Sequence, residues 1–309
     1  MKKVFIDGKA GTTGLRIEER LSGRDDIEIV TISEELRKDP QAKKEILNSV
    51  DVAFLCLPDA AAMESVSLIE NENVVVIDTS TAHRTNPAWA YGFPELDKSF
   101  EEKIRTSKRI AVPGCHASGF IALVYPLVKN GIISPDTLLT ATSLTGYSGG
   151  GKKMIADYES DELDMLLQGP RQYGLGQKHK HLPEMVKMTG LENAPVFCPI
   201  VGTFYSGMEV TVPLFKSQLL KGGIEEIKEI YRNAYNTEIV SFVESDDEDG
   251  FLSAVKLEGK DSMQIEVYGN EDRILLVARY DNLGKGASGA AVECLNIVLG
   301  ADKTKNLDI

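Results

Sequence analysis

The stretch Lys3-Val4-Phe5-Ile6-Asp7-Gly8-Lys9-Ala10-Gly11-Thr12-Thr13-Gly14 joins a short apolar run to three glycines. It predicts a strand over 3–7, a tight turn at the glycines and a helix over 12–22. At such a turn, glycines let backbone N–H groups approach a pyrophosphate at the positive end of the helix. The spacing GxxGxxG differs from the commoner GxGxxG. The prediction of a dinucleotide-binding turn therefore rests on its position directly after the first strand. The candidate dinucleotide-binding residues are Gly8, Gly11, Thr12, Thr13 and Gly14.

The first third of the chain continues this alternation of apolar runs and helical patterns. Buried parallel strands are apolar nearly throughout, and Val74-Val75-Val76-Ile77 fits that rule. The pattern is typical of parallel β-α-β units. Further strands are expected near 27–32, 51–57 and 73–78, and further helices near 40–48 and 60–70.

Beyond Cys115 the pattern changes to that of an α+β domain on a largely antiparallel sheet. A final helical pattern over 286–299 is expected to return to the first domain. The expected domains are therefore 1–114 with 286–309, and 115–285. In the second domain, helices are predicted near 115–129 and 223–236, and strands near 137–145, 207–215, 238–243, 263–269 and 273–280.

Composition excludes several classes of function. The chain has 309 residues and a net charge of −13, which argues against a general nucleic-acid binder. We find no secretory signal and no apolar run long enough to span a membrane, so a cytoplasmic protein is expected. Much of the negative charge lies in 244–249, which we interpret as a solvated loop or hairpin tip, not as a metal site.

The end of the second predicted strand bears on the choice between NAD and NADP. A single acidic residue there would bind the ribose 2′-hydroxyl, but the chain reads Ile32-Ser33-Glu34-Glu35-Leu36-Arg37-Lys38. Ser33 takes the expected position, and Arg37 and Lys38 are close enough to meet a 2′-phosphate. Glu34 and Glu35 are acidic and argue against a 2′-phosphate. We favour NADP(H); the alternative is a set of exposed residues at a helix start.

One cysteine has a setting that favours reactivity. Pro113-Gly114-Cys115-His116 predicts a turn that delivers Cys115 to the first turn of a helix. Unpaired N–H groups and the helix dipole favour a thiolate there. The other three cysteines lie in apolar surroundings and are expected to pack as thiols. With the nucleotide turn, Cys115 indicates a thioester-forming, nucleotide-dependent enzyme.

A thiolate nucleophile needs an acid/base partner, and two of the four histidines lie close together in sequence. If the stretch is extended, His179 and His181 share one face. The alternatives are a metal site, for which no third ligand stands at a familiar spacing, and two surface histidines in a charged loop. His116 follows the cysteine, but adjacent helical side chains do not face each other. Arg84 follows the end of a strand. It is expected either to bind an anion there or to be an exposed loop residue.

Together these residues resemble the N-acetyl-gamma-glutamyl-phosphate reductases of arginine biosynthesis, most closely the shorter type. The resemblance covers nearly the whole chain, and its cysteine and HxHxPE segments are specific in combination. It implies a Rossmann domain and a catalytic and oligomerisation domain of the glyceraldehyde-3-phosphate dehydrogenase-like type. It also implies NADP(H) and a homo-oligomer (dimer or tetramer); no metal is expected, because no third ligand stands at a familiar spacing. The matching segments are Gly8-x-x-Gly11-x-x-Gly14, 78–84, 91–95, 113–115, His179-x-His181-x-Pro183-Glu184 and 281–289.

The resemblance also implies roles. Cys115 would attack an acyl phosphate to form a thioester, and His179 would transfer protons. The chain departs from many relatives at His116, where they carry an aromatic or small residue. The further residues implied are Tyr173, His181 and Glu184 for positioning the substrate or the histidine, Arg84 for the substrate's anionic groups, and Asn282 and Gly286 near the cofactor.

Three other functions remain open from sequence. An aspartate-semialdehyde or aminoadipate-type dehydrogenase would share the chemistry and differ in its substrate pocket. A redox sensor that binds NADP would have Cys115 oxidised instead of acylated. A dimer-forming binding protein would have an unreactive Cys115.

Overall fold

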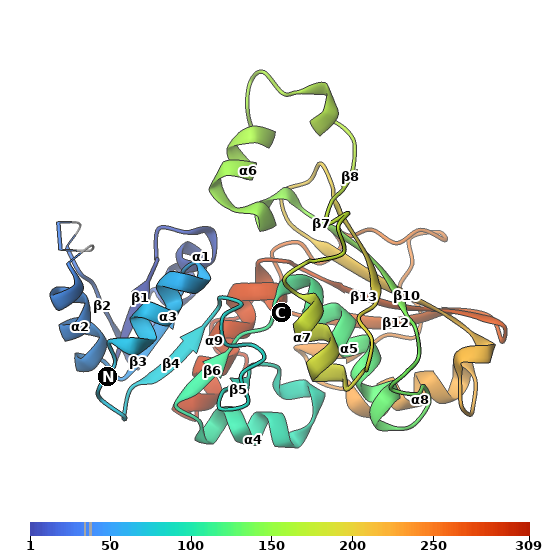
Figure 1. The fold of residues 1–309 in the computed structure, drawn as a ribbon, viewed down its shortest axis with the longest axis horizontal. Coiled ribbons are helices and arrows are strands. Elements are labelled where there is room, and N and C mark those ends of the chain that lie inside the picture. Colours follow the sequence, from blue (N-terminus) through green and yellow to red (C-terminus); the bar gives the residue numbers. More distant parts are fainter. Residues whose placement is uncertain (34, 37–38) are drawn as a thin grey trace. The chain divides into compact units, whose positions relative to one another are not determined.

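The computed structural model describes residues 1–33, 35–36 and 39–309 (Figure 1). The chain forms two compact units. The first comprises Met1–Pro94, Lys98–Gly114 and Ala287–Leu307, and the second comprises Glu95–Asp97, Cys115–Gly286 and Asp308–Ile309. Among the described residues, no helix has both the length and the apolar character needed to cross a membrane.

The first unit is a six-stranded sheet of order β2-β1-β3-β4-β6-β5, in which neighbouring strands pair in parallel. The four strands and three helices expected before residue 80 are confirmed. The short β5 and β6 and helix α4 were not predicted. The strands are β1 (Lys2–Asp7), β2 (Ile27–Val30), β3 (Val52–Leu55), β4 (Val75–Asp78), β5 (Ala90–Tyr91) and β6 (Arg109–Ala111). The helices are α1 (Thr12–Leu21), α2 (Pro40–Ser49), α3 (Asp59–Ser67), α4 (Lys98–Thr106) and α9 (Gly289–Leu299).

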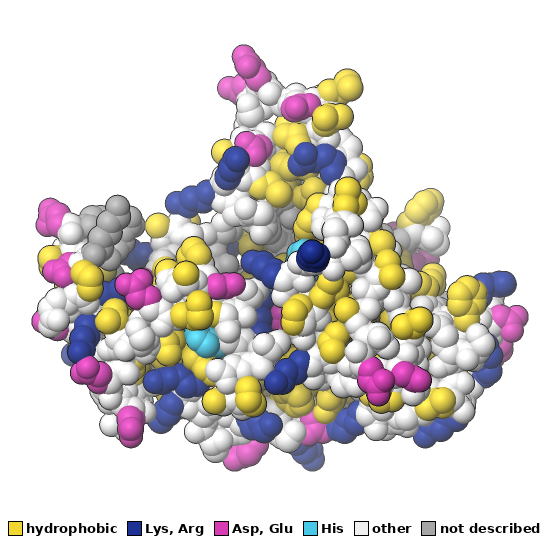
Figure 2. Space-filling view, in the orientation of Figure 1, with side chains coloured by type: hydrophobic (Ala, Val, Ile, Leu, Met, Phe, Trp, Pro, Cys, Tyr) yellow, Lys and Arg dark blue, Asp and Glu magenta, His cyan; other side chains and the backbone are white. Residues whose placement is uncertain are grey.

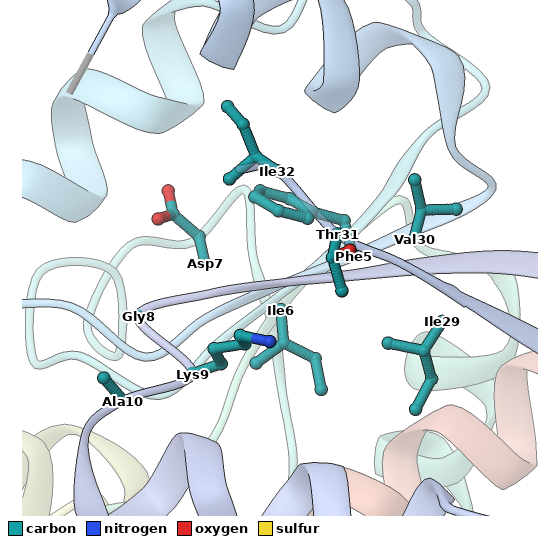
Figure 3. A pocket seen from close by; sticks show the side chains of 10 residues that line it. All are labelled: Phe5, Ile6, Asp7, Gly8, Lys9, Ala10, Ile29, Val30, Thr31 and Ile32. Atoms are coloured by element: carbon teal, nitrogen blue, oxygen red, sulfur yellow. The ribbon is translucent and has the colours of Figure 1, made fainter. Parts of the chain in front are cut away.

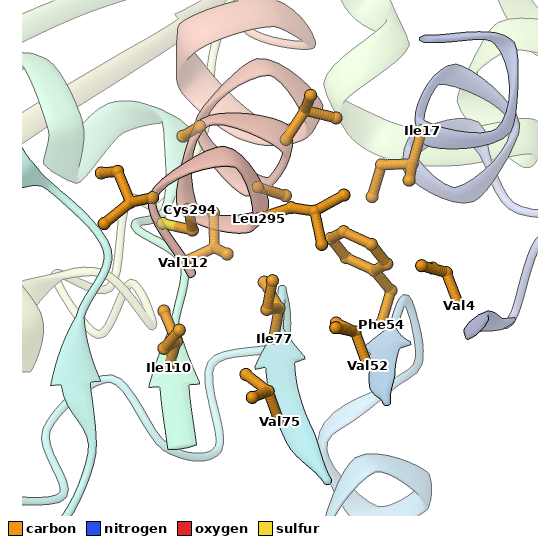
Figure 4. Packing of buried hydrophobic residues seen from close by; sticks show 14 of the residues in the cluster. Val4, Ile17, Val52, Phe54, Val75, Ile77, Ile110, Val112, Cys294 and Leu295 are labelled. Carbon is orange, nitrogen blue, oxygen red and sulfur yellow. The ribbon is translucent and has the colours of Figure 1, made fainter. Parts of the chain in front are cut away.

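Each face of this sheet carries its own apolar core. In β1, Val4 and Ile6 belong to one core and Phe5 to the other, as the two-residue period of a strand requires. Helix α9 completes the first core, and Figure 4 shows its Cys294 and Leu295 among the strand residues. The buried Cys294 therefore packs as an apolar residue, as expected.

The second unit is a seven-stranded mixed sheet of order β11-β12-β13-β10-β7-β9-β8. Strand β13 pairs antiparallel with both β12 and β10, so it lies in the interior of the sheet. Helices α5 and α8 pack on the strands, and α7 packs on α5. The strands are β7 (Thr140–Thr145), β8 (Arg171–Gln172), β9 (Val196–Val201), β10 (Met208–Phe215), β11 (Val240–Phe242), β12 (Met263–Gly269) and β13 (Arg273–Tyr280). The helices are α5 (Cys115–Lys129), α6 (Gly151–Tyr158), α7 (Leu182–Thr189) and α8 (Ile224–Ala234).

The segment from α6 to β8 forms an arm of the second unit (Figure 1). Leu163, Met165 and Leu166 of this arm are exposed, the last two by 77% and 67%. Figure 2 shows hydrophobic and acidic side chains together on this arm. Apolar side chains grouped on one exposed segment are typical of an interaction surface.

The acidic run forms the exposed hairpin tip that the sequence predicts, with one long-range contact that it does not. Glu248 and Phe251 form a β-bridge, and a tight turn at Asp249 and Gly250 connects them. The hairpin tip is therefore confirmed. However, Glu248 accepts a 2.8 Å hydrogen bond from Arg279, whose side chain is fully buried. This bond holds the pKa of Glu248 at about 2. Glu248 is therefore tied to β13, whereas Glu244, Ser245, Asp247 and Asp249 of the same run are exposed, as predicted.

Candidate active site

Cys115 is the first residue of α5, where the Pro113-Gly114 turn was predicted to place it. The residue is partly exposed, and its sulfur is not part of a disulfide. The backbone of Gly286 approaches it closely, because a Cβ built on Gly286 would lie 3.1 Å from the Cβ of Cys115. A thiol at a helix N-terminus faces unpaired N–H groups that stabilise its anion. This geometry is suited to a nucleophile.

Three histidine rings meet beside the start of α5. The ring of His116 lies 5.5 Å from that of His179 and 5.6 Å from that of His181, measured between centroids. His179 and His181 are 4.7 Å apart, so the predicted pairing of their side chains is confirmed. The backbone turns here and does not extend, since Leu182 N–H donates to the His179 carbonyl. Two surface histidines in a charged loop is therefore a wrong description of this segment.

His116 lies at the centre of a hydrogen-bonded chain that the sequence did not reveal. Its Nδ1 lies 2.7 Å from Ser143 Oγ on β7, and its Nε2 lies 2.6 Å from the hydroxyl of Tyr173. Burial is the main cause that lowers the pKa of His116 to about 3, so the ring is neutral. Only the pairing of β7, β9 and β8 brings Ser143 and Tyr173 to this ring. No local sequence signal could have found this contact.

Tyr173 and His179 are also perturbed by their surroundings. Burial raises the pKa of Tyr173, and the nearby charge of Cys115 raises it further. Burial lowers the pKa of His179 to about 4, and the charge of Lys180 adds to this effect. Nδ1 of His179 accepts a 3.2 Å hydrogen bond from the His181 backbone N–H. A neutral ring that accepts at Nδ1 carries its proton on Nε2.

The remaining predicted substrate residues differ in their positions. Glu184 is buried in the first turn of α7, which has His181 as its N-cap. Arg84 belongs to the first unit, where its Nε donates to the Val112 carbonyl and its Nη2 to the Thr79 carbonyl, both at 2.8 Å. It is only 7% exposed, so the alternative of an exposed loop arginine is wrong.

The segment before Arg84 is held firmly. Nδ1 of His83 lies 2.7 Å from the Asp78 carboxylate, and its ring stacks on Trp89 at 4.0 Å. Asp78 also accepts hydrogen bonds from the backbone and the hydroxyl of Ser80. This loop therefore presents Arg84 in a fixed position at the carboxyl end of β4.

A pocket lies at the end of β1, where the nucleotide turn was predicted. Figure 3 shows its lining, which is the end of β1, the turn and the end of β2. Gly8 has φ +83°, and a Cβ there would lie 2.3 Å from the Cys56 carbonyl oxygen. A Cβ on Gly14 would lie 2.6 Å from the Gly8 carbonyl oxygen. The turn therefore requires glycine at both positions, and its backbone is bare enough for a phosphate to approach.

The other predicted cofactor residues are distributed as follows. Gly11 is the N-cap of α1, and Thr12 and Thr13 form its first turn. Ser33 is exposed just beyond the pocket residue Ile32, whereas Arg37 lies outside the described residues.

Asn282 lies in the second unit, where its side chain connects two loops. It accepts the Gly207 N–H at 2.9 Å and donates to Ser148 Oγ at 3.0 Å. Within the described part of the chain, no three histidine, cysteine, aspartate or glutamate side chains are grouped as metal ligands would be.

Two protein-family models match this chain. Residues 4–106 match the family model "Semialdehyde dehydrogenase, NAD binding domain", and residues 115–282 match "Semialdehyde dehydrogenase, dimerisation domain". The chain is 46% identical over 308 residues to the N-acetyl-gamma-glutamyl-phosphate reductase of Sinorhizobium medicae (strain WSM419), covering 97% of this chain and 99% of the relative.

Two solved structures share the fold. Aspartate semialdehyde dehydrogenase II from Vibrio cholerae gives a TM-score of 0.72 at 17% identity and covers 97% of this chain and 99% of its own. Aspartate semialdehyde dehydrogenase with NADP from Candida albicans gives a TM-score of 0.69 at 16% identity, with the same coverage of both chains.

Proposed function

Because the chain belongs to the N-acetyl-gamma-glutamyl-phosphate reductase family, we propose that it reduces N-acetyl-gamma-glutamyl phosphate to N-acetylglutamate semialdehyde and releases phosphate, in arginine biosynthesis. The observation that supports this chemistry best is the meeting of a helix-terminal cysteine with a buried histidine cluster in one unit. The thiol supplies a nucleophile, and the cluster supplies hydrogen-bond donors for the substrate oxygens.

The nucleotide pocket fits NADP(H). The glycine turn leaves no room for a side chain at Gly8 or Gly14, which suits the close approach of a pyrophosphate to the backbone. Gly11, Thr12 and Thr13 would hold the phosphates at the start of α1, and Ser33 and Arg37 would bind the 2′-phosphate. Asn282 and Gly286 would lie near the reacting end. When bound, NADPH supplies the hydride for the reduction.

We assign the covalent step to Cys115. Its thiolate attacks the acyl carbon, the bond between that carbon and the phosphate oxygen breaks, and phosphate leaves with the electron pair. The product is a thioester on Cys115. After hydride addition, the carbon–sulfur bond breaks and the thiolate is regenerated with release of the aldehyde. The start of α5 stabilises the thiolate before attack and after release.

We assign to His179 the roles of proton donor and hydrogen-bond donor, through its Nε2–H. A neutral ring with its proton on Nε2 donates to the substrate oxygen as negative charge builds on that oxygen. Tyr173 and His181 line the same cluster, and together with the buried Glu184 they would position the substrate or His179. Arg84 would bind the substrate's anionic group, with its guanidinium oriented by two carbonyls.

We further infer a homo-oligomer in the cytoplasm. Residues 115–282 match a dimerisation domain, and the arm between α6 and β8 exposes Leu163, Met165 and Leu166. The four cysteines, all in the described part of the chain, form no disulfide, which is typical of a protein from a reducing compartment.

A substrate comparison tests the proposal. The kcat/KM for NADP⁺ reduction is measured with N-acetylglutamate semialdehyde and with aspartate semialdehyde, each with phosphate present. We expect N-acetylglutamate semialdehyde to be preferred by orders of magnitude. A preference for aspartate semialdehyde would keep the mechanism and refute the substrate.

A further inference from the structure

Three buried tyrosines donate hydrogen bonds to backbone carbonyls of α5, the helix that carries Cys115. Tyr231 and Tyr235 of α8 reach the carbonyls of Leu123 and Ala122, at 2.5 and 2.6 Å. Tyr280 of β13 reaches the carbonyl of Cys115 itself, at 2.5 Å. The three contacts have the same chemistry and differ in their distance along the helix from the nucleophile.

Within the described part of the chain, Tyr280 makes a second hydrogen bond to α5, which Tyr231 and Tyr235 do not. The Tyr280 hydroxyl oxygen accepts the Gly119 N–H at 3.0 Å. The carbonyl of Cys115 and the N–H of Gly119 are the two groups that close the first turn of an α-helix. One side chain from a neighbouring strand therefore holds both ends of that turn.

Gly119 has no side chain because Tyr280 occupies the space. A Cβ built on Gly119 would lie 2.7 Å from the Tyr280 hydroxyl oxygen, 2.9 Å from its Cε1 and 2.7 Å from Cγ2 of Val210. Glycine destabilises a helix interior relative to alanine. The chain therefore has a poor helix former at the position in α5 that Tyr280 contacts.

The anchor of Tyr280 is rigid. The residue is fully buried at the end of β13, where it pairs with Met263 of β12 and Met208 of β10. The carboxylate of Asp281, the next residue, accepts hydrogen bonds from the backbone of Leu283, Gly284 and Gly259 and from the Ser206 hydroxyl. The chain is thus fixed on both sides of the contact with Cys115.

We propose that Tyr280 is a positioning residue for the Cys115 nucleophile, because it fixes the first turn of α5 relative to β13, an interior strand of the sheet. This inference rests on the proposed function, in which Cys115 attacks the acyl phosphate. A reacting atom that moves by about 1 Å can lose roughly 100-fold in rate. Burial, followed by the charge of Cys115, raises the pKa of Tyr280 well above its usual value, so the hydroxyl remains a donor throughout the working pH range.

The test compares Tyr280→Phe with Tyr235→Phe, which removes a matched hydroxyl from the same helix. Both variants are expected to bind NADPH normally and to lose similar thermal stability. Tyr280→Phe is expected to lower kcat roughly 10- to 100-fold with the KM values nearly unchanged, and to shift the pH profile of Cys115 alkylation by iodoacetamide. Tyr235→Phe is expected to match the wild type in kcat and in alkylation. Equal behaviour of the two variants in both measurements would overturn the proposal.

Gly119→Ala provides a second route to the same contact if Tyr280→Phe fails to fold. The added methyl group displaces the Tyr280 hydroxyl, so we expect the same loss of kcat with KM retained. Unchanged kcat in a folded Gly119→Ala variant would also overturn the proposal. Cys115→Ser distinguishes a failure of the proposed function from a failure of the role of Tyr280. If that variant keeps its activity, the proposed function fails, whereas a normal Tyr280→Phe beside an inactive Cys115→Ser refutes only the role of Tyr280.

Discussion

The backbone N–H of His181 donates to Nδ1 of His179, 3.2 Å away. This contact places the ring proton of neutral His179 on Nε2, and burial keeps its pKa at about 4. The free enzyme therefore holds His179 as a hydrogen-bond donor at neutral pH. A full positive charge on the ring would require that the Nδ1 contact be lost or that a nearby anion compensate.

Replacement of His179 by asparagine tests that role. We expect kcat to fall by roughly two to four powers of ten, the usual span for general acid–base work, with NADPH binding intact. Steady-state kinetics and a fluorescence titration with NADPH measure the two effects. His181→Asn is the companion variant, and near-normal turnover in His179→Asn would move the role to His181.

The buried, neutral His116 predicts a pH dependence of stability. Its folded pKa of about 3 lies below the ordinary value of 6.5, so between these values the unfolded chain binds a proton that the folded chain does not. This contribution therefore weakens the fold as pH falls from 6.5, by up to about 1.4 kcal/mol per pH unit. Urea unfolding at pH 7, 6, 5 and 4 measures it, with His116→Asn as reference because carboxylates titrate in both proteins. Parallel curves for the two proteins would contradict the prediction.

Arg84→Lys tests the anion-binding role. Lysine cannot serve both the Val112 and Thr79 carbonyls while it presents a planar pair of donors, so we expect KM for the acyl substrate to rise with a smaller change in kcat. Initial rates over a range of substrate concentrations measure this. A lowered melting temperature with unchanged KM would assign Arg84 to structure alone.

Gly8 and Gly23 form a matched pair for the nucleotide turn. Both have positive φ, +83° and +80°, but a Cβ on Gly23 meets nothing within 4 Å, whereas one on Gly8 would lie 2.3 Å from the Cys56 carbonyl oxygen. Gly23→Ala should cost about 1 to 2 kcal/mol of unfolding free energy and leave NADPH affinity unchanged. Gly8→Ala should cost more and weaken NADPH binding. Equal NADPH affinity in the two variants would refute the role of this turn.

The parts predictable from sequence are those that local patterns determine. Unbroken apolar runs such as Val52–Leu55 predicted the parallel strands, and Pro113-Gly114 before Cys115 predicted the helix that begins at the thiol. Strand β8 has two residues and β9 contains Pro199, so neither shows a clear strand pattern. These two strands help to bring Tyr173 and Phe197 to His116, and the centre of the histidine cluster was missed with them.

The long-range contact of the acidic run was missed for a related reason. The run at 244–249 has the composition of a solvated loop. Lys256 pairs with it from nearby in sequence, but Arg279, which also pairs with it, is more distant and lies on an interior strand. Arg279 also pairs with Glu266 on β12, whose side chain is fully buried. Long-range ion pairs of this kind follow from strand register, which the sequence pattern alone does not specify.

The most direct test of the account is phosphate-dependent NADPH formation from N-acetylglutamate semialdehyde, measured for the wild type and for Cys115→Ser. The account predicts that activity requires both phosphate and Cys115, because phosphate must release the acyl group from the Cys115 thioester. Phosphate-dependent activity that persists in Cys115→Ser would contradict it.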